Sequence, residues 1–432
     1  MKKRILAGTA AATLLGVVAL AATVSGAIAR SGASPLPASS CSKIQNGSGK
    51  YLIASDLPLQ GAGRTQTIEM TKAIAFILKQ HGWKAGKYSL AYQSCDDATA
   101  QAGKWDSGKC SANANAYAQN KDVVGVIGTF NSGCAEIVVP ILNRASNGPI
   151  AMISPANTYV GLTHGGPGTA AGEPNKYYPT GKRNYARVVA ADDYQGAADA
   201  LLAKGLGVKK VFILNDKEAY GLGVATNFKN AAKKLGIKVV GFTAWDGKAS
   251  SYEALAVKIK ASGAQGVFLG GLVCENGGKL IKDLRSTLGA DVKIILPDGF
   301  TPISSVVEGA GDAANGAYVS VAGLPNEQLK GAGKKFVSDF KAANGKEPDP
   351  YSVYAAQSAD VLLDAIAKSD GTRTAVTKNL IKTKVTNGIL GNFAINPNGD
   401  TNSNPVTIYQ IKGGKQQTFK VITPPTSLVK VA

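Results

Sequence analysis

The chain has 432 residues, of which 44% are hydrophobic and 18% are charged, and its formal net charge is +19. This composition excludes an intrinsically disordered chain, and the length exceeds what one hydrophobic core usually covers, so we expect two domains. The positive charge does not indicate nucleic-acid binding, because the lysines are scattered and no basic motif interleaved with aromatic residues occurs. An anionic cell wall or lipid surface is the neighbour that this charge favours.

The N-terminus has the pattern of a secretory signal peptide. A basic start at residues 2–4 precedes an apolar run that reaches Ala22, and residues 27–29 (AIA) form a cleavage signal. We therefore predict a signal peptide at residues 1–29 and a protein exported to the periplasm or cell surface of a bacterium; its removal would lower the net charge from +19 to +16. A retained membrane anchor is the alternative, although the apolar run is short for a bilayer span. The Ser-, Pro- and Gly-rich residues 30–49 are expected to form a flexible tether.

From residue 51 onward, strand-like and helical segments alternate along the chain. Short apolar runs indicate buried strands, and longer segments with apolar residues on one face indicate helices. This alternation is typical of parallel sheets with helices on both faces, so we predict a doubly wound α/β fold. The predicted strands are residues 51–55, 88–92, 123–127, 150–154, 185–189, 209–214, 238–242, 266–269, 292–296, 317–321 and 406–411, and the predicted helices include 65–80, 252–261, 279–287, 327–343, 352–368 and 374–382.

Two of these strands end in clusters of small polar residues. Residues 131–133 (NSG) follow strand 123–127, and residues 154–158 (SPANT) follow strand 150–154. In doubly wound sheets, ligands bind outside the carboxyl ends of the strands, where loops lead into helix N-termini. Hydroxyl and backbone N–H groups in these loops would form a neutral corner that binds an anion. Ordinary helix capping by Ser, Asn and Thr is the alternative explanation.

Five cysteines remain after removal of the signal peptide. None belongs to a Cys-x-x-Cys pair, so the sequence indicates neither a zinc site nor a redox motif. Because export permits disulfides, and because Cys95 and Cys110 flank one polar loop, we predict a bridge between these two residues. Cys41 lacks a convincing lipidation sequence, and the pairing of Cys134 and Cys274 stays open.

The chain lacks the sequence motifs of common enzymes. Its two histidines, His81 and His164, are both expected at the surface, and no phosphate-binding Gly-x4-Gly-Lys loop occurs. Residues 61–63 (GAG) and 221–223 (GLG) begin a dinucleotide-binding fingerprint but lack its third glycine. No pair of carboxylates is marked as catalytic by its local sequence. We therefore predict a protein that is not an enzyme and that uses no metal or other cofactor.

Six short motifs follow one another in the chain: residues 53–61 (IASDLPLQG), 126–133 (VIGTFNSG), 152–158 (MISPANT), 215–221 (NDKEAYG), 266–271 (GVFLGG) and 296–299 (LPDG). In this order they resemble the type I periplasmic solute-binding proteins of ABC importers, especially the leucine/isoleucine/valine-binding branch. Each motif alone is generic, but the order of all six is specific, and the resemblance extends from about residue 50 to residue 415.

The resemblance implies two Rossmann-like lobes, joined by a three-strand hinge, that close on a solute. Lobe 1 would comprise residues 44–187 and 318–390, and lobe 2 would comprise residues 188–317 and 391–432. The implied function is that of a monomeric, extracytoplasmic component of an ABC importer. It would capture an amino acid or a related small carboxylated or amine solute and deliver it to a membrane permease. A ligand sensor of the same fold is the alternative, followed by a secreted enzyme.

The resemblance also implies a set of ligand contacts. Small residues after two strands of lobe 1 would hold the α-carboxylate, and a tyrosine of lobe 2 would pack on the amine region. An acidic residue after a later strand of lobe 2 would neutralise the ammonium group, and an arginine would reach the entrance. Leu272 stands where the family tends to have an aromatic residue, and the acid is one methylene shorter than the usual glutamate, which weighs against branched-chain amino acids themselves. The small residues are Asn131, Ser132, Ala156 and Thr158. The tyrosine is Tyr220, the acidic residue is Asp298 and the arginine is Arg64.

Overall fold

The computed structural model describes residues 32–429, which belong to one compact unit. The predicted signal peptide lies outside these residues. The described part contains a six-stranded and a seven-stranded sheet, both flanked by helices, so the predicted doubly wound α/β fold is confirmed. Within residues 32–429, none of the helices combines the length and the hydropathy that crossing a membrane requires.

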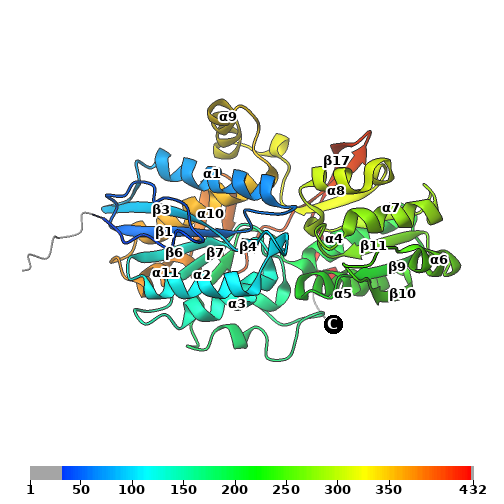
Figure 1. Cartoon of the computed structure of the whole chain (residues 1–432), viewed down its shortest axis with the longest axis horizontal. Coiled ribbons are helices and arrows are strands. Elements are labelled where there is room, and N and C mark those ends of the chain that lie inside the picture. The colour runs from blue at the N-terminus through cyan, green and yellow to red at the C-terminus, as the bar shows by residue number, and fades with distance from the viewer. Residues whose placement is uncertain (1–31, 430–432) are drawn as a thin grey trace, which may run out of the picture. The chain divides into compact units, whose positions relative to one another are not determined.

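The first sheet has the strand order β2-β3-β1-β6-β7-β8. All neighbours are parallel except β2, which runs antiparallel to β3. Strand β6 is buried along its whole length because helices cover both faces of the sheet: α1 packs beside α10 on one face, and α2 beside α3 on the other (Figure 1). The bounds are β1 Tyr51–Leu57, β2 Lys84–Ala85, β3 Tyr88–Asp96, β6 Val123–Gly128, β7 Ala151–Ser154, β8 Tyr185–Arg187, α1 Arg64–Gln80, α2 Ser107–Gln119, α3 Ser132–Asn143, α10 Pro350–Ala367 and α11 Arg373–Ile381.

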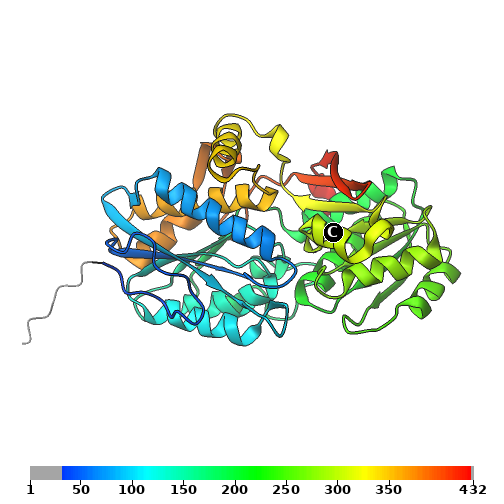
Figure 2. The same cartoon turned by 45° about the horizontal axis from the view of Figure 1, so that its top comes forward.

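The second sheet has the order β10-β9-β11-β12-β13-β16-β17. Its first five strands are parallel, and the antiparallel hairpin β16–β17 extends the sheet beyond β13 (Figure 2). Strand β17, which was not predicted, is mostly exposed. The bounds are β9 Lys210–Asn215, β10 Lys238–Ala244, β11 Gly266–Gly270, β12 Lys293–Leu296, β13 Tyr318–Ala322, β16 Val406–Lys412, β17 Lys415–Ile422, α4 Asp192–Gly205, α5 Ala219–Lys234, α6 Glu253–Ala261, α7 Gly277–Leu288, α8 Ile303–Ala310 and α12 Thr426–Val429.

Three segments connect the two sheets and their helices. They follow β8 (residues 188–191), β13 (residues 323–331) and the hairpin formed by β14 (Lys384–Gly388) and β15 (Gly391–Ala394), which continues into residues 395–405. We use the term first half for the six-stranded sheet with α1–α3, α9 (Ala332–Asn344), α10, α11 and the small hairpins. The second half is the seven-stranded sheet with its helices. A chain that passes three times between two sheets has the connectivity expected for a hinge.

Two predicted lobe boundaries are each wrong by one strand. Residues 318–322 were assigned to lobe 1, but β13 pairs with β12 and β16 and therefore belongs to the second half. Strand β15 was assigned to lobe 2, but it pairs with β14 in the first half. The adjoining Leu390 donates its backbone N–H to Gln357 of α10 over 3.0 Å.

The segment predicted as a flexible tether is wrong for residues 32–49, which pack against the first half. Leu36 and Cys41 are buried, and Cys41 is disulfide-bonded to Cys95 at the end of β3. The backbone N–H of Leu36 donates to the side-chain oxygen of Gln93 over 2.6 Å. Burial of apolar side chains and a covalent bond hold this segment despite its Ser-, Pro- and Gly-rich composition.

The predicted Cys95–Cys110 disulfide is also wrong. Cys95 pairs with Cys41, and Cys110 of α2 pairs with Cys134 of α3, because these two helices pack against each other. Cys274 forms no disulfide in the described part of the chain. Cys110 and Cys134 lie near the Asp97 carboxylate with the spacing of metal ligands, but their sulfur atoms are bonded to each other and offer no thiolate.

Candidate functional site

The loops that follow five parallel strands line one small cavity between the two halves. These loops leave β6 and β7 in the first half and β9, β11 and β12 in the second, so the carboxyl ends of both sheets face the same space. The volume of the cavity is about 20 Å³, which is room for roughly one water molecule. The lining residues are Phe130, Asn131, Ser132, Ala156 and Thr158 from the first half, and Glu218, Tyr220, Leu272, Asp298 and Gly299 from the second.

Six of the seven predicted ligand contacts line this cavity together. The seventh, Arg64, is the first residue of α1, is exposed, and lies outside the lining. The structure therefore brings together residues from motifs that lie up to 167 positions apart, Asn131 to Asp298, at one place. The four other lining residues are Phe130, Glu218, Leu272 and Gly299.

The first half presents a hydroxyl group and a helix N-terminus to the cavity. Ser132 is the first residue of α3 and is 4% exposed, and its Oγ accepts a hydrogen bond of 3.3 Å from the backbone N–H of Tyr159. Because Oγ is the acceptor in this bond, the hydroxyl proton can be donated to an anion. The dipole of α3 favours negative charge at the same position.

Helix capping by a side chain, which was the alternative explanation, is found in neither loop. Asn131 is the N-cap residue of α3, but its side chain makes no capping hydrogen bond. In the neighbouring loop, Ser154 Oγ accepts from the backbone N–H groups of Ala156 and Asn157, at 3.1 and 2.8 Å, and so closes its own turn. Ser154 therefore has a structural role, whereas Asn131 and Ser132 line the cavity.

The second half contributes the buried carboxylate of Asp298, which accepts hydrogen bonds from two tyrosines. Tyr220 Oη donates to Asp298 Oδ1, and Tyr351 Oη of α10 donates to Asp298 Oδ2, both over 2.5 Å. Burial raises the pKa of Asp298, and the hydrogen bonds from Tyr220, Tyr351 and Gln195 offset part of that rise. Since Tyr351 belongs to the first half, Asp298 also joins the two halves.

A second buried carboxylate, Asp192, was not predicted. It is the first residue of α4, directly after the crossover from β8, and its backbone N–H donates to the Thr158 carbonyl over 2.8 Å. Its side chain is fully buried, and neither carboxylate oxygen accepts a hydrogen bond of normal geometry, although the Thr158 hydroxyl lies near enough to lower its pKa in part. Burial, followed by the charge of Asp298, raises the pKa of Asp192 well above its usual value. The sequence feature that could have identified Asp192 is an acidic residue directly after a segment that connects the two sheets.

An apolar wall completes the cleft. The rings of Phe130 and Tyr351 meet edge to face with centroids 5.5 Å apart, and Leu272 lies opposite them in the second half. Two carboxylate residues, Asp298 and Glu218, belong to the lining, and Asp192 is hydrogen-bonded through its backbone N–H to the lining residue Thr158. The cleft thus combines an anion-binding corner, an acidic side and an apolar wall.

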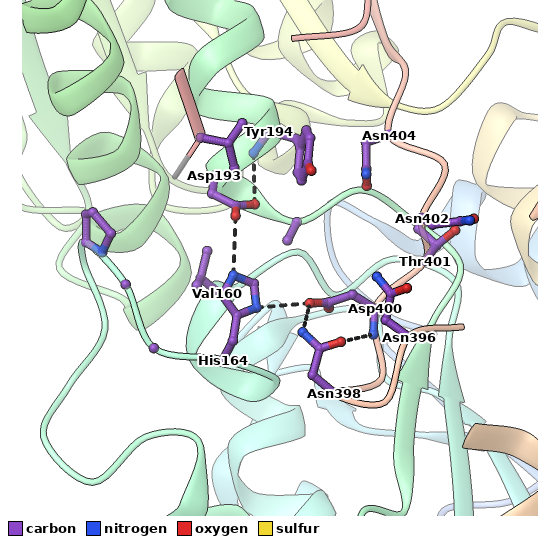
Figure 3. Close-up of a pocket in the computed structure, with 15 residues that line it drawn as sticks. Val160, His164, Asp193, Tyr194, Asn396, Asn398, Asp400, Thr401, Asn402 and Asn404 are labelled. Atoms are coloured by element: carbon purple, nitrogen blue, oxygen red, sulfur yellow. Dashed lines mark hydrogen bonds and ion pairs between the residues drawn. The ribbon is translucent and has the colours of Figure 1, made fainter. Parts of the chain in front are cut away.

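A larger cavity, of about 470 Å³, lies beside two of the crossovers (Figure 3). His164, which was expected at the surface, is half-buried there: its Nε2 lies 3.3 Å from Asp193 Oδ2 and its Nδ1 lies 2.9 Å from Asp400 Oδ2. Arg187 Nε donates to the other oxygen of Asp400 over 2.7 Å. Burial alone would lower the pKa of His164, but the two carboxylates outweigh it and raise the pKa to about 9. His164 is therefore a fixed cation at the hinge at neutral pH.

Residues 58–416 match the family described as periplasmic binding protein, and the chain belongs to this family of two-lobed solute-binding proteins. It is a binding protein and not an enzyme. The amino acid binding protein of Pseudomonas aeruginosa is 26% identical over 299 residues, which cover 69% of this chain and 74% of that one. The Leu/Ile/Val-binding protein homolog 3 of Brucella melitensis is 27% identical over 345 residues, which cover 79% and 85%. The resemblance inferred from the motifs is confirmed.

Solved structures show the same fold. The leucine binding protein LivK of Thermotoga maritima superposes with a TM-score of 0.75 at 23% identity, over 87% of this chain and 99% of that chain. A solute binding protein of an ABC transporter from R. palustris, solved in complex with benzoate, superposes with a TM-score of 0.70 at 19% identity, over 87% and 97%.

Proposed function

We propose that this protein is the exported solute-binding component of an ABC importer, and that it carries an amino acid in the cleft between its halves to a membrane permease. Membership of the periplasmic binding protein family supports the general role. The names of the Pseudomonas and Brucella relatives support an amino acid as the solute class. The basic, apolar start of the sequence supports export.

The buried carboxyl group of Asp192, whose oxygens accept no hydrogen bond of normal geometry, supports an amino acid as the solute. Because burial raises the pKa of Asp192 well above its usual value, this group loses its proton and becomes charged only when a cation reaches it. The ammonium group of an amino acid supplies both a charge and three donors. In the same cleft, Ser132 and the N-terminus of α3 can receive the α-carboxylate, so the two ends of a zwitterion meet opposite partners.

Capture requires the halves to separate and then to close. A cavity of about 20 Å³ is smaller than any amino acid, so the solute enters an open form and displaces side chains from their present contacts. The bonds from Tyr220 and Tyr351 to Asp298 are the ones that an ammonium group would compete with. Because the solute contacts both halves, its binding energy shifts the protein toward the closed form.

An aromatic monocarboxylate without an amine is the second candidate. Both oxygens of Asp298 already accept tyrosine hydroxyls, and Phe130 and Tyr351 form an aromatic wall. The R. palustris protein was solved with such a solute, benzoate. The two candidate solutes differ in the amine group. Only the amino acid, which carries this group, requires a charged Asp192.

Paired solutes separate the candidates. Thermal unfolding would be followed with L-leucine against 4-methylpentanoate, L-phenylalanine against 3-phenylpropanoate, and benzoate. A solute at one hundred times its dissociation constant adds about 2.7 kcal/mol to the free energy of unfolding. The proposal predicts stabilisation by at least one amino acid and none by its deaminated partner. Stabilisation by benzoate or 3-phenylpropanoate alone would support the second candidate.

A substitution tests the role of the carboxylate in the same assay. Asp192→Asn should abolish the stabilisation by amino acids and leave the melting temperature of the solute-free protein nearly unchanged, because burial already disfavours the charged form of Asp192 there. Asp291→Asn, at an exposed position, is the matched control and should behave as the wild type. If Asp192→Asn retains amino-acid binding, the proposed counter-charge is wrong.

A further inference from the structure

A lysine on a small hairpin of the first half reaches two glutamates of the second half. The hairpin consists of β4 (Ala98–Thr99) and β5 (Lys104–Trp105) and lies where the two halves adjoin (Figure 1). Lys104 Nζ lies 2.6 Å from Glu218 Oε1 and also contacts Glu275 Oε1. The neighbouring Trp105 donates its indole N–H to Glu218 Oε2 over 3.3 Å.

Both ends of this bridge are anchored at the cleft. The Trp105 ring packs directly on Gly133, the residue after Ser132 in α3, so closely that a Cβ at Gly133 would lie 2.5 Å from the ring. Glu218 lines the cavity and precedes α5, which carries Tyr220. The backbone carbonyl of Glu275 accepts the indole N–H of Trp245 over 2.8 Å. Movement of one half against the other would therefore separate Lys104 from its partners.

The bridge is shielded from solvent more than ordinary surface pairs are. The side chains of Lys104, Glu218 and Glu275 are 29%, 15% and 18% exposed. Burial alone would lower the pKa of Lys104, but the hydrogen bonds and charges of the two glutamates raise it. Without the lysine, two carboxylates of like charge would face each other at the edge of the cleft. Among residues 32–429, the other ion pair between the halves joins His164 to Asp193 beside the crossovers.

We propose that the β4–β5 hairpin is a latch, and that Lys104 sets how firmly the closed halves hold the solute by bridging Glu218 and Glu275. The inference rests on the proposed function only in that closure traps a solute. Lys104 is a positioning residue in this account, since it acts through Glu218 and the closed geometry. Partly buried charge pairs are screened by salt less than exposed ones but still weaken as ionic strength rises.

The latch is tested in solute-free protein by the distance between the halves. Spin labels at Lys72→Cys on α1 and Lys260→Cys on α6, both exposed positions, report this distance by double electron–electron resonance in a Cys274→Ser background. The latch predicts a short-distance population in the otherwise unchanged protein. Lys104→Met and Glu218→Gln/Glu275→Gln should each raise the ratio of open to closed molecules by about tenfold, whereas Lys104→Arg should retain the closed population.

A control substitution and a salt titration accompany these variants. Lys341→Met removes an exposed ion pair with Glu347 within the first half and should leave the distances unchanged. If Lys104→Met fails to fold, sodium chloride raised from 50 to 500 mM in the double-labelled protein should open the halves instead. Unchanged distances in folded Lys104→Met, in Glu218→Gln/Glu275→Gln, or across the salt series would overturn the latch. Because no solute is present, these outcomes are independent of the solute panel.

Discussion

The hydroxyl of Tyr351, carried by α10 in the first half, donates a 2.5 Å hydrogen bond to Oδ2 of Asp298, which follows β12 in the second half. Tyr220 occupies the other oxygen of the same carboxylate. The acid that was expected to bind a solute's ammonium group therefore also ties the halves together when the cleft holds only side chains. Under the proposed function, solute binding and closure would therefore use the same atoms, and a hinged receptor requires such coupling.

Replacing Asp298 by Asn should remove the negative charge of the side chain while keeping its size and shape. The Asn side chain still accepts one tyrosine hydroxyl but has no charge for an ammonium group. Because hydrogen bonds to charged groups contribute about 1.5–3 kcal/mol, the affinity for an amino acid should fall roughly 10- to 150-fold. Isothermal titration calorimetry with the amino acid that stabilises the wild type most would measure the loss. An equal loss for its deaminated analogue would show that Asp298 acts through the fold instead.

Ser132→Ala should weaken every carboxylated solute alike. The substitution removes the hydroxyl that faces the cavity, while the N-terminus of α3 remains. A hydrogen bond to a charged carboxylate contributes about 1.5–3 kcal/mol, so affinity should fall roughly 10- to 150-fold for amino acids and for deaminated acids. Calorimetry on both solute types tests this, with the exposed Ser251→Ala as control. A loss confined to amine-bearing solutes would contradict the assignment of Ser132 to the carboxylate.

Much of this site could be predicted because its residues follow buried strands. Strand β6 is a continuous apolar run that ends at Gly128, and the polar residues after it had to lie at the edge of a parallel sheet. The same reasoning predicted that Tyr220 and Asp298 lie at the edge of the second sheet, once the order of the six motifs indicated the family. Asp192 was missed because its importance comes from burial, and the letters DD at the start of a helix are equally typical of a solvated first turn.

Features set by contacts between distant segments could not be predicted. The cysteine partners depend on packing of α2 against α3 and of residues 32–49 against β3. Strand β13 was predicted as a strand, but its sequence does not say which sheet it joins. Strand β17 (KQQTFKVI) is polar because it is an exposed edge, so it has no apolar periodicity to reveal it.

The disulfide pattern is directly testable. Peptide mapping of the non-reduced protein by mass spectrometry should recover Cys41 linked to Cys95 and Cys110 linked to Cys134, with Cys274 alkylated only after unfolding or slowly. Loop-closure entropy predicts that replacing Cys110 and Cys134 by Ser lowers the free energy of unfolding by roughly 3.5 kcal/mol. A peptide that links Cys95 to Cys110 would contradict the structure.

The protonated side chain of His164 should make the free energy of unfolding depend on pH in a defined direction. The pKa of His164 is raised from 6.5 to about 9, so protonation favours the folded state. Its contribution is complete below about pH 6.5 and is lost as the pH rises through about 9. For a side chain that is 32% exposed, screening limits this contribution to about 2 kcal/mol.

Urea unfolding at pH 6, 7.5 and 9 compares the variants. His164→Gln should lose stability at pH 6 relative to the wild type and match it more closely at pH 9. His81→Gln, which changes an exposed pair with Asp360, should follow the wild type at every pH. A constant difference between His164→Gln and the wild type over this range would show that the imidazole charge makes no contribution.

If the two ends of one solute meet opposite partners from the two halves, a crystal structure with the amino acid that stabilises the protein most should show this arrangement. We expect electron density between Ser132 and the pair Asp192 and Asp298, with the carboxylate at the N-terminus of α3 and the ammonium group within hydrogen-bond distance of an acidic oxygen. Density for the amino acid in the cavity beside His164, or a cleft that keeps its present side-chain contacts while the solute binds elsewhere, would contradict it.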